Sequence, residues 1–488
     1  MPEHAIKGKT AKETELMATK TVYQGYYQNS QTENARMDIY AYNAPSDGTF
    51  TLEGQKYLGV RDYRTAQHYA VYKNCGLNTL LAGASGSFND EQFADSSAKK
   101  VLDTAHAAAL SQVIVLDQKL YALSQVEGGI IGENKQFATE AELDAWVEER
   151  TSFYRDHPAF FGVQLADVPK HTQLEAVGQV YRSMKRVCPK AFIHINLAHM
   201  VFRYEEVYEP AYKEGWDFYD RYEAYVKMYF EQTGADHVSA DAYPFEEGWS
   251  EGFQPYYFRN IQILEKVAKT YGAQLHFTLQ AWGQYVNGKL AHRIPSAQEM
   301  NLQMHALLGF GAKKLSYHQY WSSTDNRFLG AYSPDGWAIV HGDGQPTPLY
   351  AEVQRLNATA QKLMPVLNEF EHVAETYAAV SPFVSKPMHI KFTLRNQMQN
   401  AELSTSQEMA MAHELYDEKR GQYLYVVQNI TCPLFGKDLP KQTSKITFLK
   451  NWTKVDVFDG NEWRTEDLVD GTFTAELENG DAVYLLPY

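Results

Sequence analysis

The sequence has few cysteines, no long apolar run and no basic stretch, and each absence narrows what the protein can be. The three cysteines among its 488 residues, Cys75, Cys188 and Cys432, lie far apart and share no metal-binding spacing. We therefore expect reduced, buried thiols in a cytoplasmic protein. The N-terminal stretch MPEHAIKGKTAKETELMATK is charged, so no secretory signal peptide is visible. No apolar run is long enough to span a bilayer, and we expect no membrane partner.

The balance of charge and the missing motifs exclude further classes of protein. A net charge of −15 argues against nucleic acid as a partner, because phosphate binding needs a basic face. No His-x-His or HExxH spacing indicates a metal site, and no G-x-S-x-G elbow indicates a serine hydrolase. We expect neither a metal ion nor another cofactor. The histidines His194, His276 and His305 are interpreted as packing or hydrogen-bonded core residues.

Aromatic residues, by contrast, are abundant. They make up 14% of the chain, and 34 of them are tyrosines, whose apolar ring and polar tip suit half-polar ligands such as sugars. Tyrosine is also common in strands and at their rims, so its abundance alone does not decide the ligand. With 44% hydrophobic and 22% charged residues, the composition is that of a globular protein large enough for one large domain and a smaller one.

Short apolar runs alternate with longer segments of helical periodicity from residue 36 onward. Apolar residues recur at helical spacing, with charges on the opposite face, in segments such as 96–110, 139–156 and 172–187. The eight strand candidates are residues 37–42, 78–83, 112–117, 160–167, 192–199, 237–243, 275–282 and 314–321. Parallel strands that are buried on both faces are continuous apolar runs, and helices connect them.

Eight such strand–helix units, closed by a helical segment at 348–364, predict a (β/α)8 barrel over residues 36–370. A doubly wound open sheet is the competing fold, but no glycine-rich phosphate loop follows the first strand. Residues 1–35 are polar and are expected to form an N-terminal arm or a short helix. The expected fold class of residues 36–370 is therefore α/β.

The pattern changes after about residue 370, where short strand candidates replace the helical segments. These candidates are residues 386–394, 421–430, 444–450, 454–460 and 481–488. The turn signals between them are Asp459-Gly460, Asp470-Gly471 and Asn479-Gly480. No helix of useful length fits here, so we expect a C-terminal antiparallel β-sandwich over residues 371–488.

Catalytic groups in a (β/α)8 barrel lie at the C-terminal ends of the strands, where the loops form one pocket. This rule selects the polar and aromatic residues that close the predicted strands. They are Asp38 and Tyr40 on the first strand, Asp117 on the third, Asp167 on the fourth, Asn196 and His199 on the fifth, Asp241 on the sixth, Gln280 and Trp282 on the seventh, and Tyr317, His318 and Trp321 on the eighth. Tyr243 and the loop residues Glu246 and Glu247 are further candidates.

Asp167 and Asp241 are the two candidates for catalysis. Each closes an apolar run shortly before a proline, so each side chain should project near the mouth of the barrel. Two carboxylates at such a mouth suit acid/base work on a glycosidic oxygen, provided that their surroundings push the two pKa values apart. The alternative for a strand-end aspartate such as Asp167 is a structural one, in which it caps the amides of the following loop.

The seventh and eighth strands end in LQAWG and YHQYW, which combine aromatic rings with amide and imidazole groups. Flat aromatic faces stack on sugar rings, while the polar groups bond hydroxyls. Trp282, Tyr317 and Trp321 are therefore candidate sugar platforms beside Gln280 and His318. A hydrophobic lid over the barrel core is the alternative for Trp282.

The motif order resembles glycoside-hydrolase-type barrels of the clan that contains β-galactosidases and cellulases. The closer resemblance is to a poorly characterised bacterial subgroup with GYFLWDEP, VNL, D-x-Y-P-F and Y-F-T-Y-W motifs on strands four, five, six and eight. This chain has GVQLADVP, INLAH, DAYPF and YHQYW in that order, and GWAIVHGDGQPTPLYAEVQRLN is similar to the subgroup's AIIDRDGKPTELY hairpin and closing helix. The resemblance covers about residues 36 to 370 and implies a carbohydrate substrate.

The chain departs from the clan at both usual catalytic positions. Val168 stands where the clan has its acid/base glutamate, and Gln280 stands where strand seven normally ends in the nucleophile. Three hypotheses follow. The first is a glycoside hydrolase that uses Asp167 and Asp241 as its pair. The second is a carbohydrate-binding barrel without catalysis, and the third is an unrelated barrel lyase or isomerase.

Overall fold

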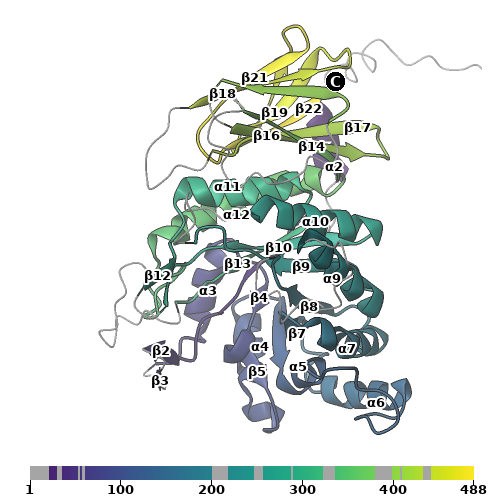
Figure 1. Ribbon diagram of the computed structural model, residues 1–488. Helices are drawn as coiled ribbons and strands as arrows, with labels where there is room; N and C mark the ends of the chain where they lie inside the picture. The colour runs from purple at the N-terminus through teal and green to yellow at the C-terminus, as the bar shows by residue number, and fades with distance from the viewer. Residues whose placement is uncertain are drawn as a thin grey trace, which may run out of the picture.

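A computed structural model describes residues 21–29, 36–52, 55–57, 61–200, 218–246, 256–286, 289–322, 336–379, 398–406, 409–431 and 441–488. Two parts are visible in Figure 1, a barrel of strands and helices below and a layer of antiparallel strands above it. Helices α11 and α12 lie between the two parts. The predicted strand at 386–394 and Cys432 lie outside the described residues, as do residues 1–20 and Glu247.

Eight parallel strands form the barrel, in the order β1-β13-β10-β9-β8-β7-β6-β4. They are β1 (Ile39–Ala41), β4 (Leu80–Leu81), β6 (Val113–Asp117), β7 (Phe160–Asp167), β8 (Phe192–Leu197), β9 (His237–Asp241), β10 (Gln274–Gln280) and β13 (Lys314–His318). The ring closes between β1 and β4, where the amide of Asn78 donates 2.9 Å to the carbonyl of Ile39. All eight predicted strands are therefore confirmed, and so is the barrel.

Helices connect successive strands and cover the outside of the ring. They are α3 (Ala66–Asn74), α4 (Ser97–Ala107), α5 (Gln118–Ser124), α6 (Glu140–Thr151), α7 (Leu174–Val187), α9 (Phe218–Thr233), α10 (Tyr257–Thr270), α11 (Ala297–Gly309) and α12 (Pro348–Leu367). Their starts follow capping rules. Ser296 and Glu299 form a capping box at α11, and Pro348 occupies the first turn of α12.

Short elements are inserted between these strands and helices. They are the 3-10 helices η2 (Gly83–Gly86), η3 (Phe93–Asp95) and η4 (His171–Gln173), strand β5 (Ser87–Phe88), and the hairpins β2 (Phe50–Leu52) with β3 (Gln55–Tyr57) and β11 (Gln284–Val286) with β12 (Lys289–His292).

Alternate strand residues face the inside of the barrel, as the period of two requires. On the β8 to β10 side these are histidines, with the His237 and His276 rings stacked at a centroid distance of 4.5 Å. On the β1, β4 and β6 side they form an apolar cluster of Tyr40, Tyr42, Leu81 and Ile114. The inside of the barrel is therefore polar on one side and apolar on the other.

The C-terminal part is a two-sheet sandwich, as predicted. A six-stranded sheet has the order β14-β16-β17-β22-β19-β20, and a three-stranded sheet has the order β15-β18-β21. The strands are β14 (Glu371–Ala379), β15 (Ala401–Thr405), β16 (Met409–Asp417), β17 (Gln422–Asn429), β18 (Gln442–Phe448), β19 (Lys454–Phe458), β20 (Trp463–Asp467), β21 (Thr472–Leu477) and β22 (Ala482–Pro487). A hydrophobic cluster between the sheets contains Val427, Phe448 and Leu485.

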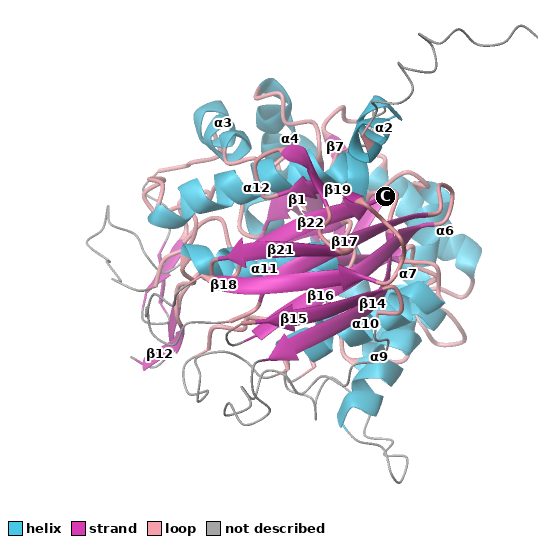
Figure 2. Cartoon of the chain, turned by 90° about the horizontal axis from the view of Figure 1, so that it is seen from above, coloured by secondary structure: helices cyan, strands magenta, loops and turns pink. Residues whose placement is uncertain are grey.

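The sandwich packs on helix α11 through polar and apolar contacts. Tyr484 Oη and His305 Nδ1 lie 2.8 Å apart, and the amide of Gln428 donates 3.0 Å to the carbonyl of Leu302. Seen from above, the strands of the sandwich lie across the helices of the barrel (Figure 2). Apolar residues of the barrel and of this sheet face belong to one continuous core, so the sandwich is packed tightly on the barrel.

Helix α2 (Val22–Asn29) confirms the short helix expected near the N-terminus and packs against the sandwich. Its Tyr26 hydroxyl donates 3.0 Å to Asp417, and the Tyr23 ring stacks on Trp463 at 5.4 Å. Elsewhere, Cys75 and Cys188 are buried free thiols, as predicted. Within the described residues, we found no helix with the length and apolar character needed to cross a membrane.

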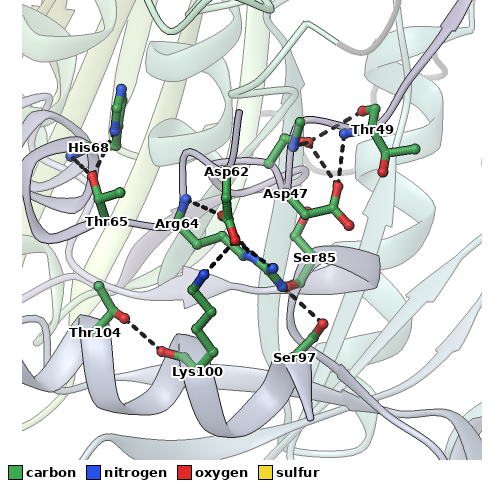
Figure 3. A network of polar contacts seen from close by, with 12 residues as sticks. Asp47, Thr49, Asp62, Arg64, Thr65, His68, Ser85, Ser97, Lys100 and Thr104 are labelled. Atoms are coloured by element: carbon green, nitrogen blue, oxygen red, sulfur yellow. Dashed lines mark hydrogen bonds and ion pairs between the residues drawn. The ribbon is translucent and has the colours of Figure 1, made fainter. Parts of the chain in front are cut away.

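A polar network anchors the loop between β1 and α3 to the wall of the barrel (Figure 3). The guanidinium of Arg64 binds Asp62 through two nitrogens, at 2.9 and 2.8 Å. Its third nitrogen donates 2.9 Å to the carbonyl of Ser85 in η2 and 2.9 Å to the hydroxyl of Ser97 in α4. Lys100 adds a second ion pair to Asp62. Arg64 thus fixes η2, which follows strand β4, against helix α4.

Candidate active site

A cavity of about 880 Å³ lies at the C-terminal ends of the barrel strands. Seven of the residues predicted from the sequence line it, namely Asp167, His199, Asp241, Tyr243, Glu246, Trp282 and His318. They come from β7, β9, β13 and the segments that follow β8, β9 and β10. None of the described lining residues belongs to the sandwich. The barrel alone therefore supplies the described walls of this cavity.

Asn196 joins the two candidate carboxylates. Its side-chain nitrogen donates 3.2 Å to Oδ1 of Asp167 and 2.9 Å to Oδ2 of Asp241. Because one nitrogen serves both, these two oxygens lie at most about 6 Å apart. Strands β7, β8 and β9 are neighbours, so the three side chains meet at one edge of the barrel.

A bulge in β7 aims Asp167 at the cavity. Gln164 pairs with His194, but Ala166 pairs with Ile195 and Asp167 with Asn196, so Leu165 is an extra residue. An extra residue reverses the alternation of inward and outward side chains beyond it. Asp167 therefore faces inward beside Asn196 instead of outward toward the helices. Val168, which follows it, has φ 50°, an uncommon backbone conformation for a β-branched residue.

The surroundings of Asp167 favour its neutral form. Asp167 is exposed to the solvent of the cavity. Its carboxyl group is nevertheless surrounded by many protein atoms, which weaken its hydration. Desolvation, followed by the negative charge of Asp241, raises the pKa of Asp167 to about 6, although the amide of Asn196 opposes the shift. Asp167 can thus hold a proton at mildly acidic pH and give it up near neutrality.

The surroundings of Asp241 favour its ionised form. Burial by itself would raise its pKa, but the contact and charge of His199 and the hydrogen bond of Asn196 outweigh burial and lower the pKa of Asp241. His199 Nδ1 lies 3.5 Å from Oδ1, and the Tyr243 hydroxyl donates 2.9 Å to Oδ2. The two carboxyl groups therefore have pKa values shifted in opposite directions, as an acid and a base require.

Aromatic rings form the wall beside Asp241. Trp282 contacts Tyr243 edge-on at a centroid distance of 5.5 Å and His318 at 5.0 Å. His292, on β12, lies 4.9 Å from the Trp282 ring. Burial lowers the pKa of His318 to about 4, so this imidazole is neutral near pH 7. A wall of rings with neutral polar edges can contact both the faces and the hydroxyls of a sugar.

Tyr42 lines the cavity beside His318, whose ring centroid lies 5.8 Å away, and is fixed by residues beneath it. Its hydroxyl lies 2.7 Å from Nε2 of His194, whose Nδ1 lies 3.3 Å from the hydroxyl of Tyr40. Burial lowers the pKa of His194 to about 3, so this imidazole is neutral and joins the two phenols. His194 is thus a core residue, as expected, but one that positions a tyrosine of the cavity.

Seven residues predicted for the site are absent from the cavity lining. Asp38 pairs with Lys314 at the N-terminal end of the barrel, and Asp117 is buried against Arg150 at 2.7 Å while it caps helix α5. Tyr317 faces outward and donates 2.7 Å to Asn357. The remaining four are Tyr40 and Asn196, which lie beneath the cavity, Gln280, which bonds the carbonyl of Arg293, and Trp321, which packs on Tyr63. Apart from Asn196, these residues are left out of the site that we propose.

Other lining residues were not predicted. They are Tyr42, Asn43, Leu81, Gly83, Ala84, Leu116, Tyr121, Gln164, Val168, Gln284 and His292. Several occupy the last positions of predicted strands, but most are apolar or uncharged, and the search for polar strand ends passed them over. Once the structure shows that Tyr40 and Ile114 face inward, the period of two places Tyr42 and Leu116 on the same inner face. Among the described residues, no group of His, Cys, Asp and Glu could hold a metal ion.

Comparisons with known proteins found similarity only among solved structures. No protein-family model and no curated protein matches the chain. An α-amylase from Anoxybacillus is 12% identical over 94% of this chain and 99% of its own, with a TM-score of 0.47. A family 5 glycoside hydrolase from Bacteroides vulgatus is 10% identical over 86% of this chain and 85% of its own, also with a TM-score of 0.47. A β-galactosidase from Marinomonas is 10% identical with a TM-score of 0.39, and the match spans 62% of this chain and 58% of that enzyme.

Proposed function

We propose that the chain is a glycoside hydrolase in which Asp241 is the nucleophile and Asp167 is the general acid/base. The observation that carries this proposal is the Asn196 amide, which bonds both carboxyl groups at 3.2 and 2.9 Å. Because the two bonded oxygens lie at most about 6 Å apart, the pair is closer than the roughly 6.5–9.5 Å of inverting enzymes, which favours retention of anomeric configuration. The opposed pKa shifts assign the roles.

In the first step, an oxygen of Asp241 attacks the anomeric carbon and the bond from that carbon to the glycosidic oxygen breaks. Asp167 donates its proton to the departing oxygen, and a glycosyl ester of Asp241 remains. In the second step, Asp167 takes a proton from water while the water oxygen attacks the anomeric carbon. The ester bond breaks, Asp241 leaves as a carboxylate, and Asp167 is protonated again.

The neighbours of each carboxyl group fit these roles. Tyr243 and His199 contact Asp241 and stabilise the negative charge that returns to it when the ester breaks. Trp282 and His318 lie on the same side and would contact the sugar. Asp167 needs water in the second step, and it is open to the solvent of the cavity.

Chromogenic nitrophenyl glycosides of both anomeric configurations test the activity. With a sugar that is cleaved, Asp241→Asn should lower kcat by about a thousandfold or more, because no nucleophile remains. Asp167→Asn should slow glycosides with poor leaving groups far more than nitrophenyl glycosides, because only the former need the proton. Asp90→Asn, at an exposed position outside the cavity, is the matched control and should leave kcat unchanged.

Azide rescue then tests the assignment of roles. In Asp241→Gly, azide should replace the nucleophile and give a glycosyl azide of inverted configuration. In Asp167→Gly, azide should attack the glycosyl ester and give an azide of retained configuration. Unchanged rates in both aspartate variants would disprove the proposed pair. Sugar-dependent thermal shifts without turnover of any glycoside would instead indicate a binding barrel, the second hypothesis from the sequence.

A further inference from the structure

The wall of the cavity is divided into two sectors by the order of the barrel strands. From β8 through β9, β10 and β13 to the end of β1, the lining residues carry imidazole, indole, phenol, amide or carboxylate groups. From β4 through β6 to the end of β7, the character changes. The lining residues there, other than Gln164 and Asp167, are Leu81, Gly83, Ala84, Leu116, Tyr121 and Val168. Among the described residues, these six carry one phenol, that of Tyr121, and no charged group, side-chain amide or imidazole. We call these six residues the apolar sector.

Apolar side chains of this sector are accessible from the cavity. Leu116 and Val168 are half-buried, and Ala84 is exposed. Accessible aliphatic groups inside a concave pocket mark a place where an apolar ligand is bound. A second sugar would find few partners for its hydroxyl groups here, and such groups lose free energy when they are removed from water without a hydrogen bond.

The position of Asp167 decides which part of a substrate meets this sector. Asp167 closes β7, and the apolar sector begins on the same strand end and continues over β6 and β4. Asp241 lies on the other side, two strands away from β7. If Asp167 protonates the departing oxygen and Asp241 takes the anomeric carbon, the leaving group extends from Asp167 away from Asp241. That direction leads into the apolar sector.

The apolar sector is also held in place. Gly83 and Ala84 belong to η2, and Arg64 binds the carbonyl of the next residue, Ser85, at 2.9 Å (Figure 3). The same guanidinium bonds Ser97 at the start of α4 and pairs with Asp62. A wall that is fixed before the ligand arrives loses little conformational entropy on binding.

We propose that the apolar sector binds a hydrophobic aglycone, so that the substrates are glycosides of alkyl or aryl alcohols rather than oligosaccharides. This inference rests on the proposed function, because it takes Asp167 as the acid that faces the leaving group. The sugar itself occupies the polar sector, beside Asp241, Tyr243 and Trp282.

A substrate series in the wild-type protein tests the inference. For the sugar and anomer identified with nitrophenyl glycosides, kcat/KM is compared for the glycosyl fluoride, the methyl glycoside, the octyl glycoside and a disaccharide with the same glycone. The octyl glycoside should exceed the methyl glycoside by at least about tenfold, since each buried methylene contributes a factor of roughly four. Its kcat/KM should also exceed that of the disaccharide, although octanol is a weaker acid than a sugar hydroxyl and its anion is the poorer leaving group.

The outcomes separate the two proposals. If no sugar is released from the fluoride or from any nitrophenyl glycoside, the hydrolase proposal fails. If the fluoride is cleaved but the disaccharide equals or exceeds the octyl glycoside, the hydrolase proposal stands and the hydrophobic aglycone is disproved. Equal kcat/KM for the octyl and methyl glycosides would disprove it as well.

Two substitutions test whether the preference for octyl over methyl glycosides comes from the apolar sector. Ala84→Asp adds a charge at the exposed edge of the sector, and Leu116→Asn adds an amide deeper in it. Each should lower the ratio of octyl to methyl kcat/KM by about fivefold or more, with the fluoride as the internal reference for folded enzyme. Ala141→Asp, on the exposed face of α6, is the matched control and should keep the ratio. An unchanged ratio in both wall variants, despite normal cleavage of the fluoride, would overturn the inference.

Discussion

The backbone amide of Val168 donates a 2.7 Å hydrogen bond to the carbonyl oxygen of Asn196. This bond keeps β7 and β8 paired one residue beyond Asp167, at the place where the β7 bulge has already changed the register. The side chain of the same Asn196 bonds the Asp167 carboxyl group. The main chain of Asn196 therefore fixes the direction of Asp167, and its side chain opposes the rise in the pKa of that carboxyl group.

Replacing Asn196 should disturb both carboxyl groups at once. In Asn196→Ala, we expect kcat/KM to fall by about a hundredfold, because an amide that bonds two catalytic groups is lost. The pKa of Asp167 should rise further, since the amide lowers it in the wild type, and the alkaline limb of the pH profile should move to higher pH. Asn357→Ala is the matched control, since Asn357 is also buried but joins Tyr317 to Cys75 away from the cavity. That variant should lower Tm and keep the pH profile, and an unmoved profile in Asn196→Ala would contradict our interpretation.

The activity should depend on pH through both aspartates. Asp167 must be protonated in the first step, so kcat/KM should decline as the pH rises above about 6. Asp241 must be ionised, and its pKa lies below the usual range, so the decline on the acid side should begin only below about pH 4. The measurement is kcat/KM from pH 3 to 9. The alkaline limb should vanish in Asp167→Asn with the glycosyl fluoride, and a limb that persists would assign it to another group.

The same shifts predict opposite effects on stability. The pKa of Asp167 is raised in the fold, so its contribution is fully present below about pH 4 and is lost as the pH rises through about 6. Asp167→Asn should therefore raise Tm relative to the wild type at pH 8, by about 1–2 °C because solvent reaches the group, and not at pH 4. The pKa of Asp241 is lowered, so Asp241→Asn should reduce Tm at pH 7 and lose this effect as the pH falls below the usual aspartate range. Thermal denaturation at pH 4, 7 and 8 measures both changes in Tm. A change of the same sign in the two variants near neutral pH would refute the assignment.

The Asp117–Arg150 pair should matter for stability rather than for chemistry. Asp117 is fully buried, and Arg150 contacts it at 2.7 Å while its own side chain is 12% exposed. Arg150→Met leaves a buried carboxylate without its cation and should reduce the free energy of unfolding by about 3–5 kcal/mol. Urea denaturation measures this loss, and Arg464→Met at an exposed ion pair should change stability by less than about 1 kcal/mol. If Arg150→Met raised KM and left the free energy of unfolding nearly unchanged, Asp117 would belong to the site after all.

Arg64 should influence the apolar sector from a distance. Arg64→Lys removes the forked contacts that join Asp62, Ser85 and Ser97, and η2 should become less well fixed. We expect the ratio of octyl to methyl kcat/KM to fall about twofold to fivefold, with the rate on the glycosyl fluoride nearly unchanged. Arg186→Lys, in an exposed ion pair with Asp144, is the control variant and should change neither value. A proportional loss on every substrate would indicate a general effect on folding instead.

Much of the fold followed from the sequence because local patterns determine it. Eight apolar runs separated by amphipathic segments specified the barrel strands and helices, and turn residues such as Asn479-Gly480 specified the sandwich, where Gly480 takes the left-handed conformation. The rule that strand ends carry the chemistry selected Asp167, Asp241, His199, Trp282 and His318, all of which line the cavity. It did not select the apolar lining residues, because an apolar side chain at a strand end looks the same in a sequence whether it faces a cavity or a helix.

Two neighbours on β6 show what the sequence by itself determined and what only the tertiary structure decided. The sequence placed both Leu116 and Asp117 at the end of a barrel strand, but the fold turns Leu116 toward the cavity and Asp117 toward Arg150. On β7 the opposite happens, because one extra residue reverses the alternation and turns Asp167 inward. Composition and periodicity are local properties and can be read along the chain. Register depends on which residues of the neighbouring strand pair across a bulge, so the facing of each carboxylate was decided only when the strands came together.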